Sequence, residues 1–337
     1  MRRILILVCI AAQVLVLGIM AGEREFILST GERVRLRTAP IDPRDPFRGD
    51  FVRLRYEISA IAPGQIRESV HDHAKEKGYP VYAVLKKGEG DLYHLDYLTD
   101  ERPGDGIFLR GRVSNDWRIV RAGGAVAVKY GIEQLFVEQG RGKDIERRRG
   151  TRNSLQVPME VEVAVSSGGT AVIRDFRWSS LGMSLKMLRF HRRNRNTNPD
   201  EVTEPLSPKL EITLQNVSEA PLIVADPGNH CGFHMETTAR VARQYRAAYE
   251  GCRDIRVYGD DLIELAPGEA YTVSLDLSEP RWYVNVDGHT GEIGRYANND
   301  SFRIVYGAPT VEPAVGGDRE WKGKLPSSAF TAFRVLD

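Results

Sequence analysis

The sequence has almost no net charge. Its 337 residues include 47 Lys and Arg against 46 Asp and Glu, so the formal net charge is only +1. Proteins that bind nucleic acid normally carry a clear basic excess. The missing excess therefore argues against a nucleic-acid partner. The chain is longer than one usual hydrophobic core, so we expect two domains.

Long hydrophobic runs are also scarce. Residues 4–22 form the single example, 19 residues in which only Gln13 is polar. As a helix this run spans roughly 28 Å, which is close to the hydrocarbon thickness of a bilayer. Arg2 and Arg3 precede it and favour a cytoplasmic N-terminus. Residues 1–22 are therefore predicted to be a single-pass anchor in a bacterial inner membrane, with the rest of the chain extracytoplasmic.

A cleaved signal peptide is the alternative to this anchor. Cleavage needs small residues one and three places before the cut. The third residue back is Ile19 for a cut after Ala21, and Met20 for a cut after Gly22. Both are poor sites, so the sequence favours an uncleaved anchor and leaves cleavage open.

Cysteine is scarce as well. Cys9 lies in the apolar run, which leaves Cys231 and Cys252 as the only other cysteines. In an oxidising compartment a disulfide is the expected state of such a pair. It would close a loop of about 20 residues, worth roughly 3 kcal/mol. Reduced thiols remain an alternative, as does a zinc site, because His230 and His234 lie beside Cys231 and supply further donors.

Residues 23–178 are predicted to be a β-rich domain. Alternation over Glu25–Arg37 around Thr30-Gly31 predicts a hairpin, and the spacing of Ile66, Val70 and Ala74 predicts a helix over Gln65–Lys77. Two basic clusters, at 141–152 and 189–195, are expected in solvated loops. Strands are predicted at Val81–Lys86, Leu92–Leu98, Ile107–Val113, Trp117–Arg121, Ala125–Tyr130, Met159–Val165 and Thr170–Arg177.

A Pro- and Asp-rich run before an alternating segment is the most distinctive stretch of the chain. It reads RTAPIDPRDPFRGDFVRLRYEIS over residues 37–59. Asp42 and Asp45 suit turns between prolines, and after Gly49 the apolar residues recur with a period of two. The pattern predicts the start of a strand, with Val52, Leu54, Tyr56 and Ile58 buried. Two other interpretations, an adhesion tripeptide at Arg48-Gly49-Asp50 and a calcium site of Asp42, Asp45 and Asp50, fit the spacing less well.

Residues 49–56, GDFVRLRY, resemble the signature of the GDYXXLXY proteins, a bacterial family of membrane-anchored proteins without an assigned activity. A second block, YGIEQLFVEQG at residues 130–140, is similar to another motif of the family. The resemblance covers about residues 23–178. Phe51 replaces the motif tyrosine, and Leu135 and Glu138 replace an expected tyrosine and proline. From these blocks, the candidate interaction residues are Asp42, Asp45, Arg48, Asp50, Arg53, Arg55 and Glu133.

The remaining part, residues 179–337, has a different pattern of apolar and turn-forming residues. Short alternating segments are separated by turn signals such as Asn216-Val217-Ser218, which is typical of an antiparallel sandwich. Strands are expected in LGMSLKML, KLEITLQ, PLIVA, AYTVSLDL, SFRIVYGAP and AFTAFRVL, and a helix is expected over Thr238–Tyr249. This pattern of short strands and turns is similar to that of the immunoglobulin-like domains of bacterial envelope proteins.

The sequence contains no nucleotide-binding loop or nucleophile constellation, and we expect no cofactor and no metal. The function expected is therefore a membrane-anchored binding or assembly module with an unknown envelope protein as partner. A membrane-tethered serine/lysine hydrolase is the alternative, because RGDFVRLRY is similar to a strand of signal-peptidase-like folds. Asp42-Pro43 occupies the place of its nucleophilic serine, and Lys86 has no evident serine partner.

Overall fold

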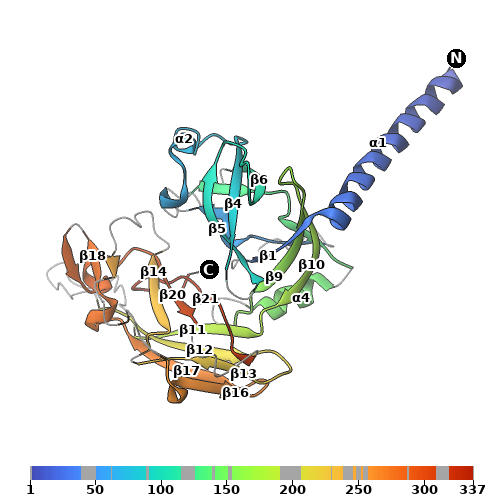
Figure 1. The fold of residues 1–337 in the computed structure, drawn as a ribbon. Coiled ribbons are helices and arrows are strands. Elements are labelled where there is room, and N and C mark those ends of the chain that lie inside the picture. Colours follow the sequence, from blue (N-terminus) through green and yellow to red (C-terminus); the bar gives the residue numbers. More distant parts are fainter. Residues whose placement is uncertain are drawn as a thin grey trace, which may run out of the picture.

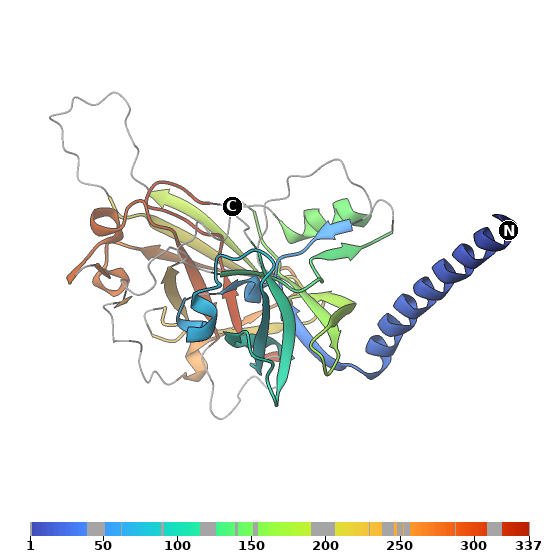
Figure 2. The ribbon, with the colours of Figure 1, turned by 90° about the horizontal axis from the view of Figure 1, so that it is seen from above.

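The computed structural model shows a mainly β protein with one long N-terminal helix (Figure 1). Helix α1 (Arg2–Thr30) projects away from the rest of the molecule in both views (Figures 1 and 2). The residues described are 2–38, 51–61, 63–88, 91–114, 126–138, 141–150, 154–189, 206–228, 230–237, 246–247, 252, 257–286, 288–308 and 319–336.

Helix α1 continues eight residues beyond the predicted anchor, so the hairpin expected over Glu25–Arg37 is wrong. Only its second strand exists, as β1 (Glu32–Arg37). Because the backbone is helical, Ile27 is buried at 4% exposure while Phe26 remains 66% exposed. Within the described residues, no helix is long and apolar enough to cross a membrane, and the side chains of residues 1–3, 5 and 7 are outside that description.

Two sheets surround the core of the N-terminal half, which we define as residues 31–178. Strand β1 pairs with β9 (Met159–Val165), and β9 pairs with β10 (Ala171–Trp178). The second sheet has the order β3-β7-β6-β4-β5, with strands Ala60–Ile61, Val126–Lys129, Ile107–Ser114, Pro80–Lys87 and Tyr93–Thr99. These strands confirm the predicted ones within one residue at most bounds, whereas Trp117–Arg121 lies outside the described residues.

The opening motif does not form one continuous strand. Strand β2 covers only Phe51–Arg53, and a 3-10 turn follows at Glu57–Ser59. The predicted burial is nevertheless confirmed, because Val52, Leu54, Tyr56 and Ile58 are all at most 5% exposed. Strand β2 pairs with β8 (Gln134–Phe136), so the two sequence blocks of the resemblance lie side by side.

The helix predictions were less successful. The helix expected over Gln65–Lys77 is reduced to a 3-10 turn at Pro63–Gln65 and one α-helical turn, α2 (Glu68–His71). The basic stretch expected in a loop is instead helix α4 (Arg141–Arg149). In the segment expected to be helical over Thr238–Tyr249, the only described residues are Arg246–Ala247, and they form strand β15.

The C-terminal half, residues 179–336, has a separate hydrophobic core that contains Phe233, Tyr306 and Phe330. Its sheets have the orders β11-β12-β17, β13-β16, β14-β20-β21 and β15-β18-β19. Apart from β15, which is given above, the strands of these sheets are Leu181–Arg189 (β11), Lys209–Asn216 (β12), Leu222–Ala225 (β13), Phe233–Thr237 (β14), Leu262–Leu265 (β16), Ala270–Asp276 (β17), Val284–Val286 (β18), His289–Gly291 (β19), Phe302–Gly307 (β20) and Lys324–Pro326 (β21). Helix α5 spans Ile293–Tyr296.

Three features of this half test the sequence directly. Asn216 ends β12 as predicted, and its side chain donates to the carbonyls of Ala220 (2.8 Å) and Leu265 (2.9 Å). The strand expected in AFTAFRVL is wrong, because Phe330 makes only isolated bridges there. The predicted disulfide between Cys231 and Cys252 is confirmed, with a Cα–Cα distance of 5.5 Å.

The burial of side chains in residues 51–58 predicts which substitutions there destabilise the fold and which do not. Leu54→Ala should lower the free energy of unfolding by about 2 to 5 kcal/mol, because it leaves a cavity in the core. The exposed neighbour Arg53→Ala is the matched control and should change it by no more than about 0.5 kcal/mol. Chemical denaturation of the two variants measures both values. Equal effects would contradict this division.

Candidate functional site

The two sequence blocks that resemble family motifs form one paired unit. In the β2–β8 pair, Phe51 lies opposite Phe136, Val52 opposite Leu135 and Arg53 opposite Gln134. Beyond the ladder, the Leu54 backbone amide donates to the Glu133 carbonyl at 2.8 Å. Among the described strands, β2 and β8 pair only with each other. We call this unit the motif ribbon, residues 51–54 and 133–136.

Two buried tyrosines fix the motif ribbon to the core. The Tyr56 hydroxyl donates to the Ile132 carbonyl at 2.8 Å, and the Tyr130 hydroxyl donates to the Ile58 carbonyl at 2.7 Å. Each tyrosine therefore comes from one sequence block and bonds to backbone beside the other. Because both hydroxyls are buried, losing either bond would leave an unpaired polar group in the core. This reciprocal arrangement holds the two blocks in one register.

Glu133 stabilises the turn between Tyr130 and the ribbon. One of its carboxylate oxygens accepts from the Tyr130 amide at 2.6 Å, and the other accepts from the Gly131 amide at 3.0 Å. Gly131 has φ +84°, a conformation that glycine adopts without a steric cost. The carboxylate predicted as an interaction group is thus held by its own turn.

The outer side of the motif ribbon is exposed. Phe136 is 71% exposed, and Arg53 and Gln134 are also exposed. Helix α4 packs beside the ribbon, where a Cβ at Gly142 would lie 3.9 Å from the Val52 and Val137 side chains, and Ile145 is buried. Figure 2 shows α4 next to this pair of strands. The exposed aromatic ring belongs to the ribbon, and the basic helix α4 packs against β2 of the same ribbon.

Helix α4 makes this surface basic. Its nine residues, RGKDIERRR, contain five basic and two acidic residues. Arg141, Arg147 and Arg148 are exposed. Arg147 pairs with Asp144 at 3.1 Å, and the Arg148 guanidinium lies over the Trp178 ring at 5.3 Å. Such exposed pairs contribute little to stability, so these side chains remain accessible to a partner.

Of the remaining predicted interaction residues, four lie outside the described residues and one is described. Asp42, Asp45, Arg48 and Asp50 lie outside the described residues. Arg55 is half-buried and has an interaction within the protein. Lys86, considered for a hydrolase, is exposed on β4 opposite His94 of β5.

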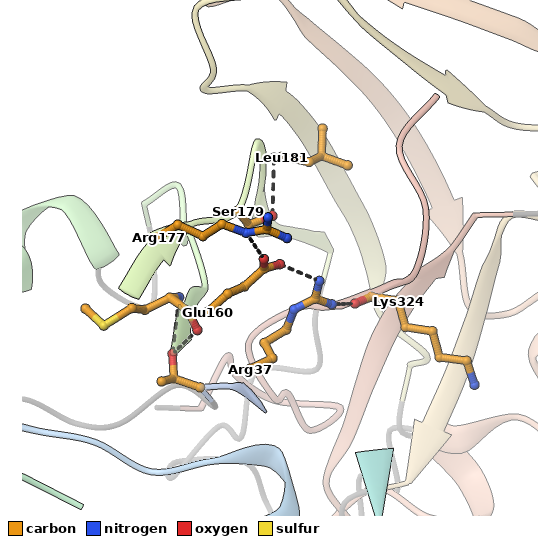
Figure 3. Close-up of polar contacts among 8 residues, drawn as sticks. Arg37, Glu160, Arg177, Ser179, Leu181 and Lys324 are labelled. Carbon is orange, nitrogen blue, oxygen red and sulfur yellow. Dashed lines mark hydrogen bonds and ion pairs between the residues drawn. The ribbon is translucent and has the colours of Figure 1, made fainter. Parts of the chain in front are cut away.

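A buried ion pair of the N-terminal half lies where that half meets the C-terminal half (Figure 3). Arg37 ends β1 directly opposite Glu160 of β9, and the guanidinium lies 3.0 Å from the carboxylate. The two side chains are only 2% and 6% exposed. Arg177 of β10 binds the second carboxylate oxygen at 2.8 Å. Arg37 also donates to the Lys324 carbonyl of the C-terminal half.

More charged groups continue this connection. The Arg37 guanidinium lies 5.8 Å from the centre of the Trp321 ring, which belongs to the C-terminal half. Burial raises the pKa of Glu57, and the nearby Arg37 and Arg303 oppose that rise. Arg303 binds Glu236 at 2.8 Å, and His234 lies 3.3 Å from the same carboxylate. We call Arg37, Glu57, Glu160, Arg177, Glu236 and Arg303 the charged seam.

A second polar cluster, which sequence reasoning missed, lies beside the disulfide. His230 Nδ1 and the Tyr271 hydroxyl each lie 2.7 Å from one oxygen of Asp226, whose side chain is 1% exposed. The other Asp226 oxygen has no partner among the described residues. The sequence prediction used His230 as a zinc donor and did not consider Asp226.

The zinc alternative is wrong, because the disulfide occupies both thiols and His230 contacts Asp226. The described part of the chain contains no group of three His, Cys, Asp or Glu side chains placed to hold a metal ion. The structure instead gives this cluster a packing role, since Arg281 donates to the His230 carbonyl at 2.9 Å.

Comparison with known proteins adds one finding about the N-terminal half. A family model described as GDYXXLXY protein matches residues 13–176. The match includes both sequence blocks of the motif ribbon and ends two residues before the end of β10. A search of curated proteins finds no match to the chain.

The charged seam predicts a strong effect of Glu160→Gln. The substitution leaves Arg37 buried without its carboxylate, which should cost about 3 to 5 kcal/mol of unfolding free energy. Glu162→Gln is the matched control on the same strand, because Glu162 and its partners Arg35 and Arg174 are 20%, 21% and 38% exposed. That control should cost about 1 kcal/mol or less. Chemical denaturation of both variants measures these changes. A small loss of unfolding free energy for Glu160→Gln would contradict the role of Glu160 as the buried partner of Arg37.

The seam also predicts a pH dependence. The hydrogen bond with His234 and the charge of Arg303 lower the pKa of Glu236 from 4.5 to about 2. A lowered pKa means that ionised Glu236 stabilises the fold above pH 4.5 and loses this contribution as the pH falls toward 2.

The measurement compares unfolding free energies of the parent and Glu236→Gln as a function of pH. The difference should be largest near neutral pH and should shrink from about pH 4.5 downward. Glu219→Gln, at an exposed turn position, is the control and should follow the parent at every pH. A parent-to-variant difference that is constant over this range would contradict the assignment.

Proposed function

Because residues 13–176 belong to the GDYXXLXY family, we propose that this protein is a membrane-anchored, extracytoplasmic binding or assembly module of the bacterial cell envelope. The motif ribbon and helix α4 form its binding surface. Its partner is a protein whose contacting surface combines apolar and acidic groups.

The exposure of Phe136 on the motif ribbon is the observation that carries this proposal. Phe136 has an interaction within the protein, but 71% of its large aromatic side chain is still exposed to solvent. Aromatic residues and arginine are enriched among the residues that dominate protein interfaces. Here exposed Phe136 and exposed Arg53 lie on the paired strands β8 and β2, basic α4 contacts β2, and two buried tyrosine hydrogen bonds hold the backbone. A rigid base with exposed recognition groups is the usual organisation of a binding site.

The charge of α4 supports the choice of an acidic partner. Five of its nine residues are basic, and several of the arginines are exposed. Complementary charge raises the association rate and excludes partners of the same sign. The surface is therefore expected to bind more weakly as the salt concentration rises.

Membrane anchoring rests on the side chains of α1. The exposed large hydrophobic residues of the helix between Ile4 and Met20 are each at least 50% exposed. Water would hydrate these groups at a considerable cost, whereas a bilayer would bury them. The arginines at positions 2 and 3 support a cytoplasmic N-terminus and an extracytoplasmic body.

We further infer that the C-terminal half is an immunoglobulin-like sandwich. Strands β11, β12 and β17 and strands β14, β20 and β21 belong to two sheets, and both sheets contribute residues to one hydrophobic core. Short antiparallel strands around a shared core are typical of such domains.

Site-specific photocrosslinking tests the binding surface. The full chain is expressed in cells with a photoreactive phenylalanine analogue at position 136. The matched control carries the analogue at Tyr258, an aromatic residue of the C-terminal half that is 67% exposed. We expect one discrete crosslinked protein from position 136 only, attached through an acidic segment that mass spectrometry identifies. Equal products from both positions, or none from position 136, would contradict the proposal.

The same cells test the anchor. The full-length chain should remain in the membrane fraction through a carbonate wash, because the apolar helix is held by the bilayer. A shortened product in the soluble fraction would show instead that the N-terminal segment is cleaved.

A further inference from the structure

Helix α1 is joined to the N-terminal half without a linker. It ends at Thr30, and β1 begins at Glu32, so Gly31 alone separates them. Glu32 is already paired with Val165 of β9. Flexible connections between a membrane anchor and a domain are usually several residues of Gly, Ser or Pro. This junction has no such segment.

The last turns of α1 are packed against the sheet. Ile27 is 4% exposed and forms a hydrophobic cluster with Ala164 of β9 and Val172 of β10. Leu28 is partly buried against the same cluster. The helix therefore cannot pivot about its end without exposing these apolar side chains to water.

The polar groups at the end of α1 are also fixed. The Arg174 guanidinium of β10 donates to the Leu28 carbonyl at 2.7 Å. The Ser29 and Thr30 hydroxyls both donate to the Phe26 carbonyl, at 2.9 and 2.7 Å. Carbonyls at a helix C-terminus lack intrahelical partners, so these bonds stabilise the end of the helix.

The backbone at Gly31 leaves no space for a side chain. Its amide donates to the Ile27 carbonyl at 2.8 Å. A Cβ at this position would lie 2.5 Å from the Ile27 oxygen and 3.0 Å from the Val165 backbone. Helix and sheet are thus in direct backbone contact at the only residue between them.

From these contacts we propose that α1 and the N-terminal half move as one rigid body, which presents the motif ribbon in a fixed direction and at a fixed height above the membrane. The partner is accordingly a protein integral to the same membrane. This inference rests on the proposed function, because it takes both the anchor and the binding surface from it.

The reason lies in the geometry of two anchored proteins. A partner in the same bilayer approaches only from the side and at a set height. A rigid connection between α1 and the N-terminal half, which we call the rigid mount, therefore increases the effective concentration of the motif ribbon and the partner's surface for each other. A partner free in solution can approach from any direction and gains nothing from such a mount. Rigidity at the junction therefore favours a membrane-integral partner.

Helical-phase insertion tests this inference in the full chain. Alanines inserted between Gly22 and Glu23 extend the helix, and each one rotates the body by about 100° and raises it by about 1.5 Å. Two alanines turn the motif ribbon by about 200°, whereas four return it to within about 40° of the parent direction. Crosslinking from position 136 reports the contact with the partner.

We expect about tenfold less crosslinking with two alanines and recovery to within about twofold with four, because the contact is lost when geometry forbids it. Gly-Ser inserts of two and four residues are the matched controls, and they should not show the recovery. Yields that are independent of insert length would overturn the rigid mount and the membrane-integral partner. The absence of crosslinking in the parent would instead contradict the proposed function.

A second measurement tests the mount without a partner. A fluorophore attached to a cysteine at Asp105, an exposed position of the N-terminal half, reports rotation of that half by time-resolved anisotropy in the full chain in lipid nanodiscs, with Cys9 replaced by Ala. The parent should rotate with the nanodisc and show no fast domain motion. Gly31→Ala combined with Ile27→Asp should introduce such motion, whereas Phe26→Ala, at an exposed position of the same helix, should not. Fast domain motion in the parent would overturn the inference.

Discussion

The ion pair between Arg37 and Glu160 is the interaction on which the arrangement of the molecule depends. The two residues are opposite each other on β1 and β9, and both side chains are almost completely buried. Removing two charges from water is costly, so a buried pair persists only with good geometry and further hydrogen bonds. Arg177 and the Lys324 carbonyl supply those bonds, the second from the C-terminal half. The pair therefore stabilises the sheet and the contact between the halves together.

The strand that contains Arg37 also connects helix α1 to the rest of the protein. Strand β1 begins one residue after α1 and ends at the charged seam, where Glu57 follows directly after Tyr56 of the family signature. Tyr56 in turn fixes the motif ribbon to the core. A short path from β1 through the bridge between Thr38 and Tyr56 thus relates α1, the charged seam and the proposed binding surface.

The sequence predicts the local features of this arrangement well. The bounds of β9 follow from alternation alone, and Asn216 ends β12 as its turn chemistry indicates. Phe26 and Ile27 are predicted to be in a strand but lie in helix α1, because a short apolar segment fits both the strand period and the helix period. Here the helix that precedes the segment continues through it. Helix α4 has a single buried apolar residue, Ile145, so it has almost no periodic pattern to recognise. Arg37 and Glu160 are 123 residues apart in the sequence, and Asp226 joins Tyr271 across 45 residues, so no local pattern could have paired them.

Hydrogen exchange of the full chain tests the central claim most directly, which is that the motif ribbon and α4 bind a partner while the seam and the helix junction keep them in place. The amides of residues 134–138 and 141–149 are compared between native membranes and purified protein in synthetic lipid. We predict slower exchange of these amides in native membranes, with the exchange of β1 and β9 equally slow in both. Unchanged exchange at the ribbon and α4, or slower exchange confined to other surfaces, would contradict the account.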